Sequence, residues 1–229
     1  PRGAARATAF ALLAIALEKG GAMVLLLLIA RSLGAEDFGR YAALMALLAF
    51  VQLGAELGQE PVLVRLLAQR AEAEADTLID GALAMRLACT TLGGVLLAAI
   101  GVRLLPTVGR VPLVLAAAGV VAASATGLRA VFRTEQRLGR LCVVALANVA
   151  TFGAALAIVH GLGLGLAGVV AAWGSGQLAA SLAAFGLVRR GRPVRPRWRT
   201  RVTATLARSG WVLALNAVLL TVTLRVGQL

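Results

Sequence analysis

Long apolar segments, separated by short polar or basic stretches, make up most of the chain. A helix needs about 20 mainly apolar residues to cross the hydrocarbon core of a bilayer. We predict a membrane-spanning helix for each of the following segments: Ala7–Ala30, Phe38–Leu57, Leu78–Leu105, Val111–Val131, Leu141–Val159, Leu162–Val188 and Trp211–Leu229. The predicted fold class is therefore all-α, a polytopic membrane protein with about seven transmembrane helices.

The composition excludes an ordinary soluble domain. Hydrophobic residues make up 60% of the 229 residues, and the mean hydropathy is +0.88. A soluble globular domain is about 45–50% apolar. A fold of this size can bury a core but cannot hide this much apolar surface, so the surplus must face lipid. Because the chain starts at Pro1 and stops at Leu229 within an apolar segment, we expect it to be a fragment.

The basic residues lie mainly at the ends of the apolar segments. The formal net charge is +13, and Lys19 is the only lysine among the 23 basic residues. We reject nucleic-acid binding as the reason for this charge, because basic residues at the ends of spans are typical of the cytoplasmic side of membrane proteins. Sixteen arginines belong to one set of ends, whereas the opposite set holds Arg31, Arg40, Arg103 and Arg110. The positive-inside rule then places the N-terminus and the loops after spans two, four and six in the cytoplasm.

A short polar turn, Leu33-Gly34-Ala35-Glu36-Asp37-Phe38-Gly39, separates the first two spans. Gly34 can take the left-handed backbone geometry that ends a helix. Glu36 and Asp37 then lie near the start of the next helix, where negative charge is favourable. The pattern predicts a tight hairpin between two membrane helices.

This hairpin resembles the start of the polysaccharide-biosynthesis flippases, the O-antigen and oligosaccharide translocases of the multidrug/oligosaccharidyl-lipid/polysaccharide exporter superfamily. The likeness rests on Ile29-Ala30-Arg31-Ser32-Leu33-Gly34 and Glu36-Asp37-Phe38-Gly39 between two apolar helices. Such proteins have two six-helix bundles joined by a basic linker. The resemblance therefore implies a six-helix transmembrane bundle over residues 1–188, a basic cytoplasmic linker over 189–209, and the first helix of a second bundle over 210–229. The linker holds Pro193 and Pro196, which favour an extended chain.

Several ionisable and amide side chains fall inside the spans, where each needs a partner or a watery cavity. The cations are Lys19, Arg86 and Arg225, and the other polar residues include Glu18, Gln52, Glu56 and Glu60. The spacing of Gln52, Glu56 and Glu60 places them on one face of a helix. Two interpretations remain open. The charges could pair between helices and hold the bundle together, or they could line a hydrated cavity. The resemblance implies that Lys19, Arg86 and Arg225 bind a pyrophosphate and that Glu56 or Glu18 couples transport to an ion gradient.

A basic stripe follows the fourth span. Arg129, Arg133 and Arg137 recur at four-residue spacing, which places them on one helical face at the cytoplasmic surface. The stripe either sets the topology and contacts lipid headgroups, or it receives a diphosphate headgroup before that group enters the cavity.

The resemblance implies a bacterial inner-membrane transporter that flips polyprenyl-diphosphate-linked oligosaccharide to the outer leaflet. The implied partners are the lipid bilayer, that lipid-linked oligosaccharide and a proton or sodium ion. We predict no catalytic residue, cofactor or metal site. Cys89 and Cys142 are expected to be small buried hydrophobic residues. The alternatives are a cation-coupled multidrug exporter of the same superfamily and a polytopic membrane glycosyl or polyprenyl transferase. An exporter would have a carboxylate within the membrane but no cations in its cavity, so Lys19 and Arg86 speak against it. A transferase would need clustered acidic residues at a membrane face, and the nearest cluster is Glu72, Glu74, Asp76 and Asp80.

Overall fold

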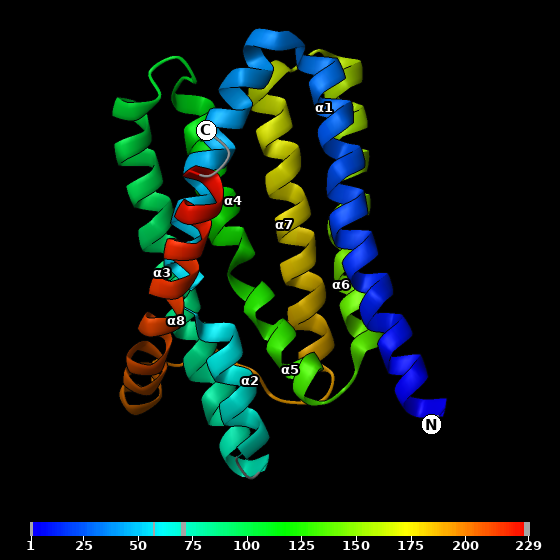
Figure 1. The fold of residues 1–229 in the computed structure, drawn as a ribbon, viewed down its shortest axis with the longest axis vertical. Coiled ribbons are helices and arrows are strands. Elements are labelled where there is room, and N and C mark those ends of the chain that lie inside the picture. The colour runs from blue at the N-terminus through cyan, green and yellow to red at the C-terminus, as the bar shows by residue number, and fades with distance from the viewer. Residues whose placement is uncertain (1, 57, 70–71, 227–229) are drawn as a thin grey trace.

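The structure is all-α throughout the part of the chain that it describes (Figure 1). The computed structural model describes residues 2–56, 58–69 and 72–226, except the side chains of residues 2–8, 72–73, 217–218 and 220–226. Its helices are α1 (Arg2–Glu56), α2 (Gln59–Gln69), α3 (Glu72–Leu104), α4 (Arg110–Ala122), the 3₁₀ helix η1 (Ala123–Leu128), α5 (Arg129–Thr134), α6 (Leu138–Leu162), α7 (Gly165–Arg189) and α8 (Thr200–Val226). The predicted all-α class is confirmed.

The first two predicted spans form a helical hairpin within α1. The chain reverses at Gly34, so the two halves of α1 run in opposite directions along the bundle (Figure 1). Gly34 has φ 73° and ψ 171°, a backbone geometry that is essentially restricted to glycine. The predicted positive φ is confirmed, but ψ is extended rather than helical. Arg40 then pairs with Glu36 at 2.6 Å and with Asp37 at 3.0 Å, which stabilises the first turns after the reversal.

Five helical segments within the described residues are long and apolar enough to cross a membrane. They cover Ala9–Gln69, Glu74–Leu104, Arg110–Thr134, Leu138–Leu162 and Gly165–Arg189. The first has 61 residues, about three times the length that one crossing needs, and it contains the Gly34 reversal and therefore both of the first two predicted spans. Predicted spans three to six match the other four segments. The seventh, Trp211–Leu229, lies in α8 and runs into residues outside the described part of the chain.

Small residues let the helices approach closely in the middle of the bundle. A Cβ atom at Gly119 in α4 would lie 2.3 Å from the Trp173 ring of α7. A Cβ at Gly176 in α7 would lie 2.6 Å from the Asn148 side chain and 2.9 Å from that of Phe152, both on α6. Membrane helices associate through this kind of close packing, because lipid tails are as apolar as the side chains themselves.

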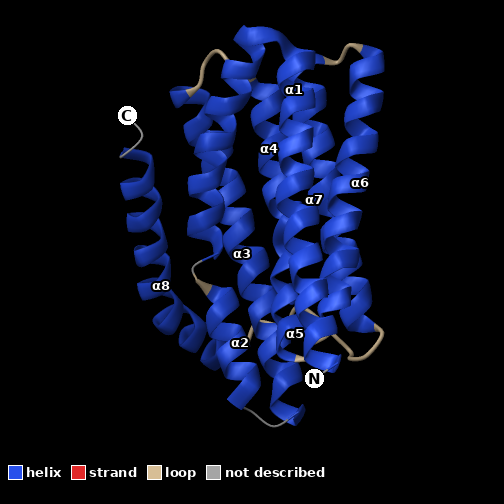
Figure 2. Cartoon of the chain, turned by 45° about the vertical axis from the view of Figure 1, so that its right-hand side comes forward, coloured by secondary structure: helices blue, strands red, loops and turns tan. Residues whose placement is uncertain are grey.

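Residues 190–199 connect α7 to α8 without helix. Helix α7 ends at Arg189 and α8 begins at Thr200. The predicted linker covers residues 189–209, and its second half therefore belongs to α8. Helix α8 lies beside α3 and α2 and also contacts α1 (Figure 2). Gly58, between α1 and α2, makes room for α8, since a Cβ there would lie 2.7 Å from the carbonyl oxygen of Gly210.

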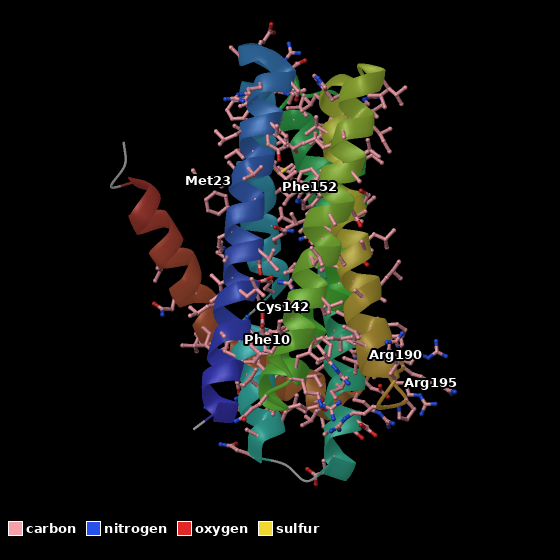
Figure 3. The ribbon with its side chains drawn as sticks, turned by 90° about the vertical axis from the view of Figure 1, so that its right-hand side faces the viewer. Phe10, Met23, Cys142, Phe152, Arg190 and Arg195 are labelled. Atoms are coloured by element: carbon pink, nitrogen blue, oxygen red, sulfur yellow. The ribbon has the colours of Figure 1, made fainter. Side chains whose placement is uncertain are left out.

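The connections fall into two groups at opposite ends of the bundle. The start of α1, α2, α5 and the linker lie at one end, which we call the basic end, and Arg190 and Arg195 lie there too (Figures 1 and 3). The Gly34 reversal and the α3–α4 and α6–α7 connections lie at the other end, which we call the turn end (Figure 1). The loops that the sequence assigns to one side of the membrane therefore do lie together.

Candidate functional site

A polar cavity of about 210 Å³ lies inside the bundle, and we call it the central cavity. Helices α1, α3, α4, α6 and α7 and the η1–α5 region contribute its lining. Its polar residues are Glu18, Gln52, Glu56, Arg86, Thr90, Thr126, Arg129, Asn148 and Gln177. All of them belong to segments able to cross a membrane. Facing a shared cavity spares these groups the cost of contact with hydrocarbon.

Arg86 of α3 pairs with Glu56 at the end of α1. The distance from Arg86 Nη2 to Glu56 Oε1 is 2.8 Å. The Arg86 side chain is 8% exposed, whereas that of Glu56 is 51% exposed. A buried cation without a partner is strongly destabilising, so the arginine depends on this contact more than the carboxylate does. Arg86 Nε is buried and has no hydrogen-bond partner among the described residues, so its N–H is available to donate a hydrogen bond to a ligand. Pairing between Glu56 and Arg86 was one of the interpretations that the sequence left open.

Arg129 lies in the central cavity rather than on a surface stripe. Its Nη1 is 3.4 Å from Glu18 Oε2, and its side chain is 18% exposed. The fourth span changes from α-helix to the 3₁₀ helix η1 just before this residue, which alters the direction in which the side chain points. Sequence reasoning missed this placement. The available signal was a run of weak helix formers, Ser124, Thr126 and Gly127, inside an otherwise apolar span.

Lys19 lines a different cavity from Arg86. This second cavity has a volume of about 550 Å³ and lies between both halves of α1 and helices α6 and α7. We call it the aromatic cavity, because its lining includes Phe38, Tyr41, Phe152 and Trp173. Glu18, Asn148 and Gln177 line both cavities, so the two adjoin each other. Lys19 and Arg86, which the resemblance assigned to one pyrophosphate site, therefore line two separate cavities. These cavities are adjacent because they share three polar lining residues.

Glu60 does not share a helical face with Gln52 and Glu56, contrary to the prediction. Helix α1 ends at Glu56, and Gly58 takes φ 60° before α2 begins. This break redirects the chain, so Gln52 and Glu56 line the central cavity while Glu60 does not. Glu60 Oε1 lies 2.8 Å from Arg133 Nη1 instead. The four-residue spacing was a valid guide only as far as the helix continues.

The predicted basic stripe is not one helical face. Helix α5 ends at Thr134 and Gln136 has φ 52°, so Arg137 lies in a turn before α6. The Arg133 and Arg137 side chains are each 53% exposed. These two arginines remain at the basic end, and Arg129 belongs to the cavity.

A comparison with models of known protein families shows which family the chain belongs to. The model of the family described as polysaccharide biosynthesis protein matches residues 4–228. The chain belongs to this family. The resemblance inferred from the Gly34 hairpin is therefore confirmed over nearly the whole chain. No curated protein and no solved structure matched it.

At its basic end, the protein has a cavity of about 450 Å³ beside the linker. Arg192 lies 3.2 Å from Asp76 and 3.3 Å from Glu135. Asp80 accepts a hydrogen bond from the backbone N–H of Arg195 at 2.8 Å. These acids hold the linker against the bundle. Within the described residues no group of three or more His, Cys, Asp or Glu is placed to hold a metal ion.

The remaining predicted cation, Arg225, has a side chain outside the described part of the chain. The central cavity thus offers two arginines, each already paired with a carboxylate, together with the Asn148 and Gln177 amides. Guanidinium groups bind phosphate oxygens through two parallel hydrogen bonds, and amides both donate and accept. The arrangement can therefore exchange a bound carboxylate for a phosphate.

Proposed function

We propose that this membrane protein moves a polyprenyl-diphosphate-linked oligosaccharide across the bacterial cytoplasmic membrane for the synthesis of a cell-surface polysaccharide. One observation carries the proposal. In a member of the polysaccharide biosynthesis family, a cavity inside the membrane-spanning bundle holds Arg86 and Arg129, each paired with a carboxylate from another helix. No bond of the substrate is broken in this process.

The central cavity receives the diphosphate. Arg86 and Arg129 both line it, and both present guanidinium groups suited to phosphate. Glu56 and Glu18 neutralise these cations while the cavity is empty of substrate, which avoids leaving unpaired charge within the membrane. An incoming diphosphate takes the place of the carboxylates. Binding therefore replaces one set of ion pairs with another at modest cost.

The aromatic cavity receives part of the oligosaccharide. It is the larger of the two cavities, and it combines the flat faces of Tyr41 and Trp173 with the polar groups of Lys19, Asn148 and Gln177. A mixture of aromatic surface and a few polar groups is typical of small-molecule sites in proteins. Because the two cavities share Asn148 and Gln177, the diphosphate and its first sugars can occupy them together.

The basic end faces the cytoplasm. It contains the N-terminus, the linker and most of the arginines, which the positive-inside rule places there. Substrate enters from this side and leaves at the turn end, by alternating access between this bundle and a second one. A proton or sodium ion supplies the drive, with Glu56 or Glu18 as the exchanging carboxylate.

Reconstitution in liposomes tests the proposal. The unmodified protein should move a fluorescent polyprenyl-diphosphate-linked oligosaccharide between leaflets, measured as the fraction that becomes accessible to a quencher outside. Arg86→Gln should abolish this movement, whereas Arg110→Gln, at the turn end, should leave it unchanged. Movement at equal rates in protein-free liposomes, or full activity of Arg86→Gln, would refute the proposed function.

The same contacts weigh against the two alternatives. A cation exporter needs a carboxylate that is free to take the cation, and in the central cavity Glu56 and Glu18 are each paired with an arginine. A membrane transferase would need free acidic residues at the membrane surface. Asp76 and Asp80, two of the clustered acids, are engaged by the linker.

A further inference from the structure

A fourth space, which we call the side pocket, opens between α1 and the start of α6. Its volume is about 260 Å³. It is lined by Ala11, Ala14, Ile15 and Glu18 of α1, Arg129 and Arg133 of α5, and Leu138 and Leu141 of α6. The Cys142 thiol donates a hydrogen bond to the backbone oxygen of Phe10 at 3.1 Å, so α1 and α6 touch at this level. Phe10 and Cys142 lie nearer the basic end than Phe152 does (Figure 3).

The side pocket adjoins the central cavity at one ion pair. Glu18 and Arg129 line both spaces, and the 3.4 Å contact between them lies at the boundary. The Glu18 side chain is 45% exposed and that of Arg129 is 18% exposed, so Glu18 is the partner that can reach water when the pair separates. A group that bound Arg129 in place of Glu18 would therefore contact both the side pocket and the central cavity.

The lining of the side pocket is amphipathic. Five of its residues are apolar, and its charged residues are Glu18, Arg129 and Arg133. Ile15 is 57% exposed in the protein alone, so this wall is accessible from the hydrocarbon core. An apolar wall combined with two cations matches a lipid that carries an anionic headgroup. A free phosphate would use the cations but would gain nothing from the apolar wall.

We propose that the side pocket admits an isoprenyl diphosphate from the membrane between α1 and α6, and that the diphosphate displaces Glu18 from Arg129 to reach the central cavity. This inference rests on the proposed function and adds the route to the same site. The lipid chain stays against Ile15 and Leu141 while the headgroup moves inward.

Three arginines of decreasing exposure mark the route. The side chains of Arg133, Arg129 and Arg86 are 53%, 18% and 8% exposed. Each has a carboxylate partner on a different segment, which keeps the cation neutralised until the headgroup arrives. The headgroup can therefore pass from one arginine to the next without leaving any of them unpaired.

Two substitutions with opposite effects test the displacement step. The probe is farnesyl diphosphate, and its binding is measured calorimetrically with the protein in nanodiscs of zwitterionic lipid. Arg129→Gln should weaken binding about tenfold or more, because it removes a charged hydrogen-bond donor. Glu18→Gln should tighten binding, because it removes the charge that competes for Arg129. Arg110→Gln, at the turn end, serves as the matched control and should not change the affinity.

Each opposite result contradicts the proposal in its own way. If Glu18→Gln weakens binding as much as Arg129→Gln does, the pair supports the structure and is not displaced. If inorganic diphosphate binds as tightly as farnesyl diphosphate, the apolar wall contributes nothing and a lipid is not the ligand.

A steric block tests the route itself. Ile15→Trp places a larger side chain in the side pocket, whereas Leu13→Trp adds the same volume to an exposed position on another face of α1. We expect Ile15→Trp to slow the liposome transport of lipid-linked oligosaccharide at least tenfold and Leu13→Trp to leave it unchanged. Normal transport by Ile15→Trp would overturn the side route and leave the proposed function intact. Absence of transport in the unmodified protein would overturn the proposed function, and the farnesyl diphosphate measurements would still stand by themselves.

Discussion

The guanidinium of Arg86 lies 2.8 Å from the carboxylate of Glu56, and this contact joins α3 to the end of α1 at the wall of the central cavity. The two partners differ in environment, since the arginine is buried and the glutamate is half exposed. The Glu56 carboxylate can therefore separate from Arg86 and become hydrated in the cavity. The arginine cannot separate without another anion to replace the carboxylate.

This asymmetry leads to a prediction for coupling. Glu56→Gln keeps the shape and a hydrogen-bond acceptor for Arg86 but removes the charge and the capacity to take up a proton. We expect the variant to bind substrate and to lose transport driven by an ion gradient, measured in liposomes with and without the gradient. If gradient-stimulated transport continues at the unmodified rate, Glu56 has no coupling role and Glu18 becomes the candidate.

Lys19 should matter for transport and not for folding. It lines the aromatic cavity at an exposed position, and no ion pair to it is found among the described residues. Lys19→Ala should therefore leave the abundance of the protein in the membrane near normal and abolish export of glycan, and Lys19→Arg should restore part of it. Loss of the Lys19→Ala protein from the membrane, measured by immunoblot, would instead assign the lysine a structural role.

The orientation of the bundle can be measured directly. The linker and the Gly34 turn lie at opposite ends of the structure, and the arginine distribution favours a cytoplasmic linker (Figure 1). A reporter fused after Arg199 should be active only in its cytoplasmic form, and one fused after Asp37 only in its external form. The reverse pattern of activity would invert the proposed direction of transport.

The contact between α4 and α7 should tolerate no added methyl group. A Cβ at Gly119 would lie 2.3 Å from the Trp173 ring and 3.2 Å from the Cα of Gly174. Overpacking of this kind costs about 1–3 kcal/mol, so Gly119→Ala should lower the thermal unfolding temperature in detergent. Gly186→Ala is the matched control on α7, because nothing lies within 4 Å of its Cβ position. An unchanged unfolding temperature for Gly119→Ala would mean that the two helices can move apart without cost.

Local features of the sequence were enough to predict the helices and the reversal. Apolar length predicts a span whatever its neighbours are, because the bilayer sets the required length. The turn at Gly34 was also predictable, since glycine followed by acids marks the end of one helix and the start of the next. The extended ψ of Gly34 was not, because its value depends on how the two halves of α1 pack.

Two errors in the candidate site arose at breaks within helices. Spacing placed Glu60 beside Glu56, and the break at Gly58 separated them. Spacing also placed Arg129 on a surface stripe, and η1 brought it to the cavity. Helical periodicity assigns faces correctly only while the helix is regular.

By itself, the sequence determined that this protein is a helical membrane protein of the polysaccharide biosynthesis family, which polar residues lie within its spans, and which loops share a side. Only the tertiary structure decided which charges meet. Arg86 and Glu56 are 30 residues apart in the chain, and Arg129 and Glu18 are 111 apart. The physical reason is that an ion pair depends on a distance of a few ångströms between side chains of separate helices. That distance follows from helix packing, and no local pattern of residues encodes it.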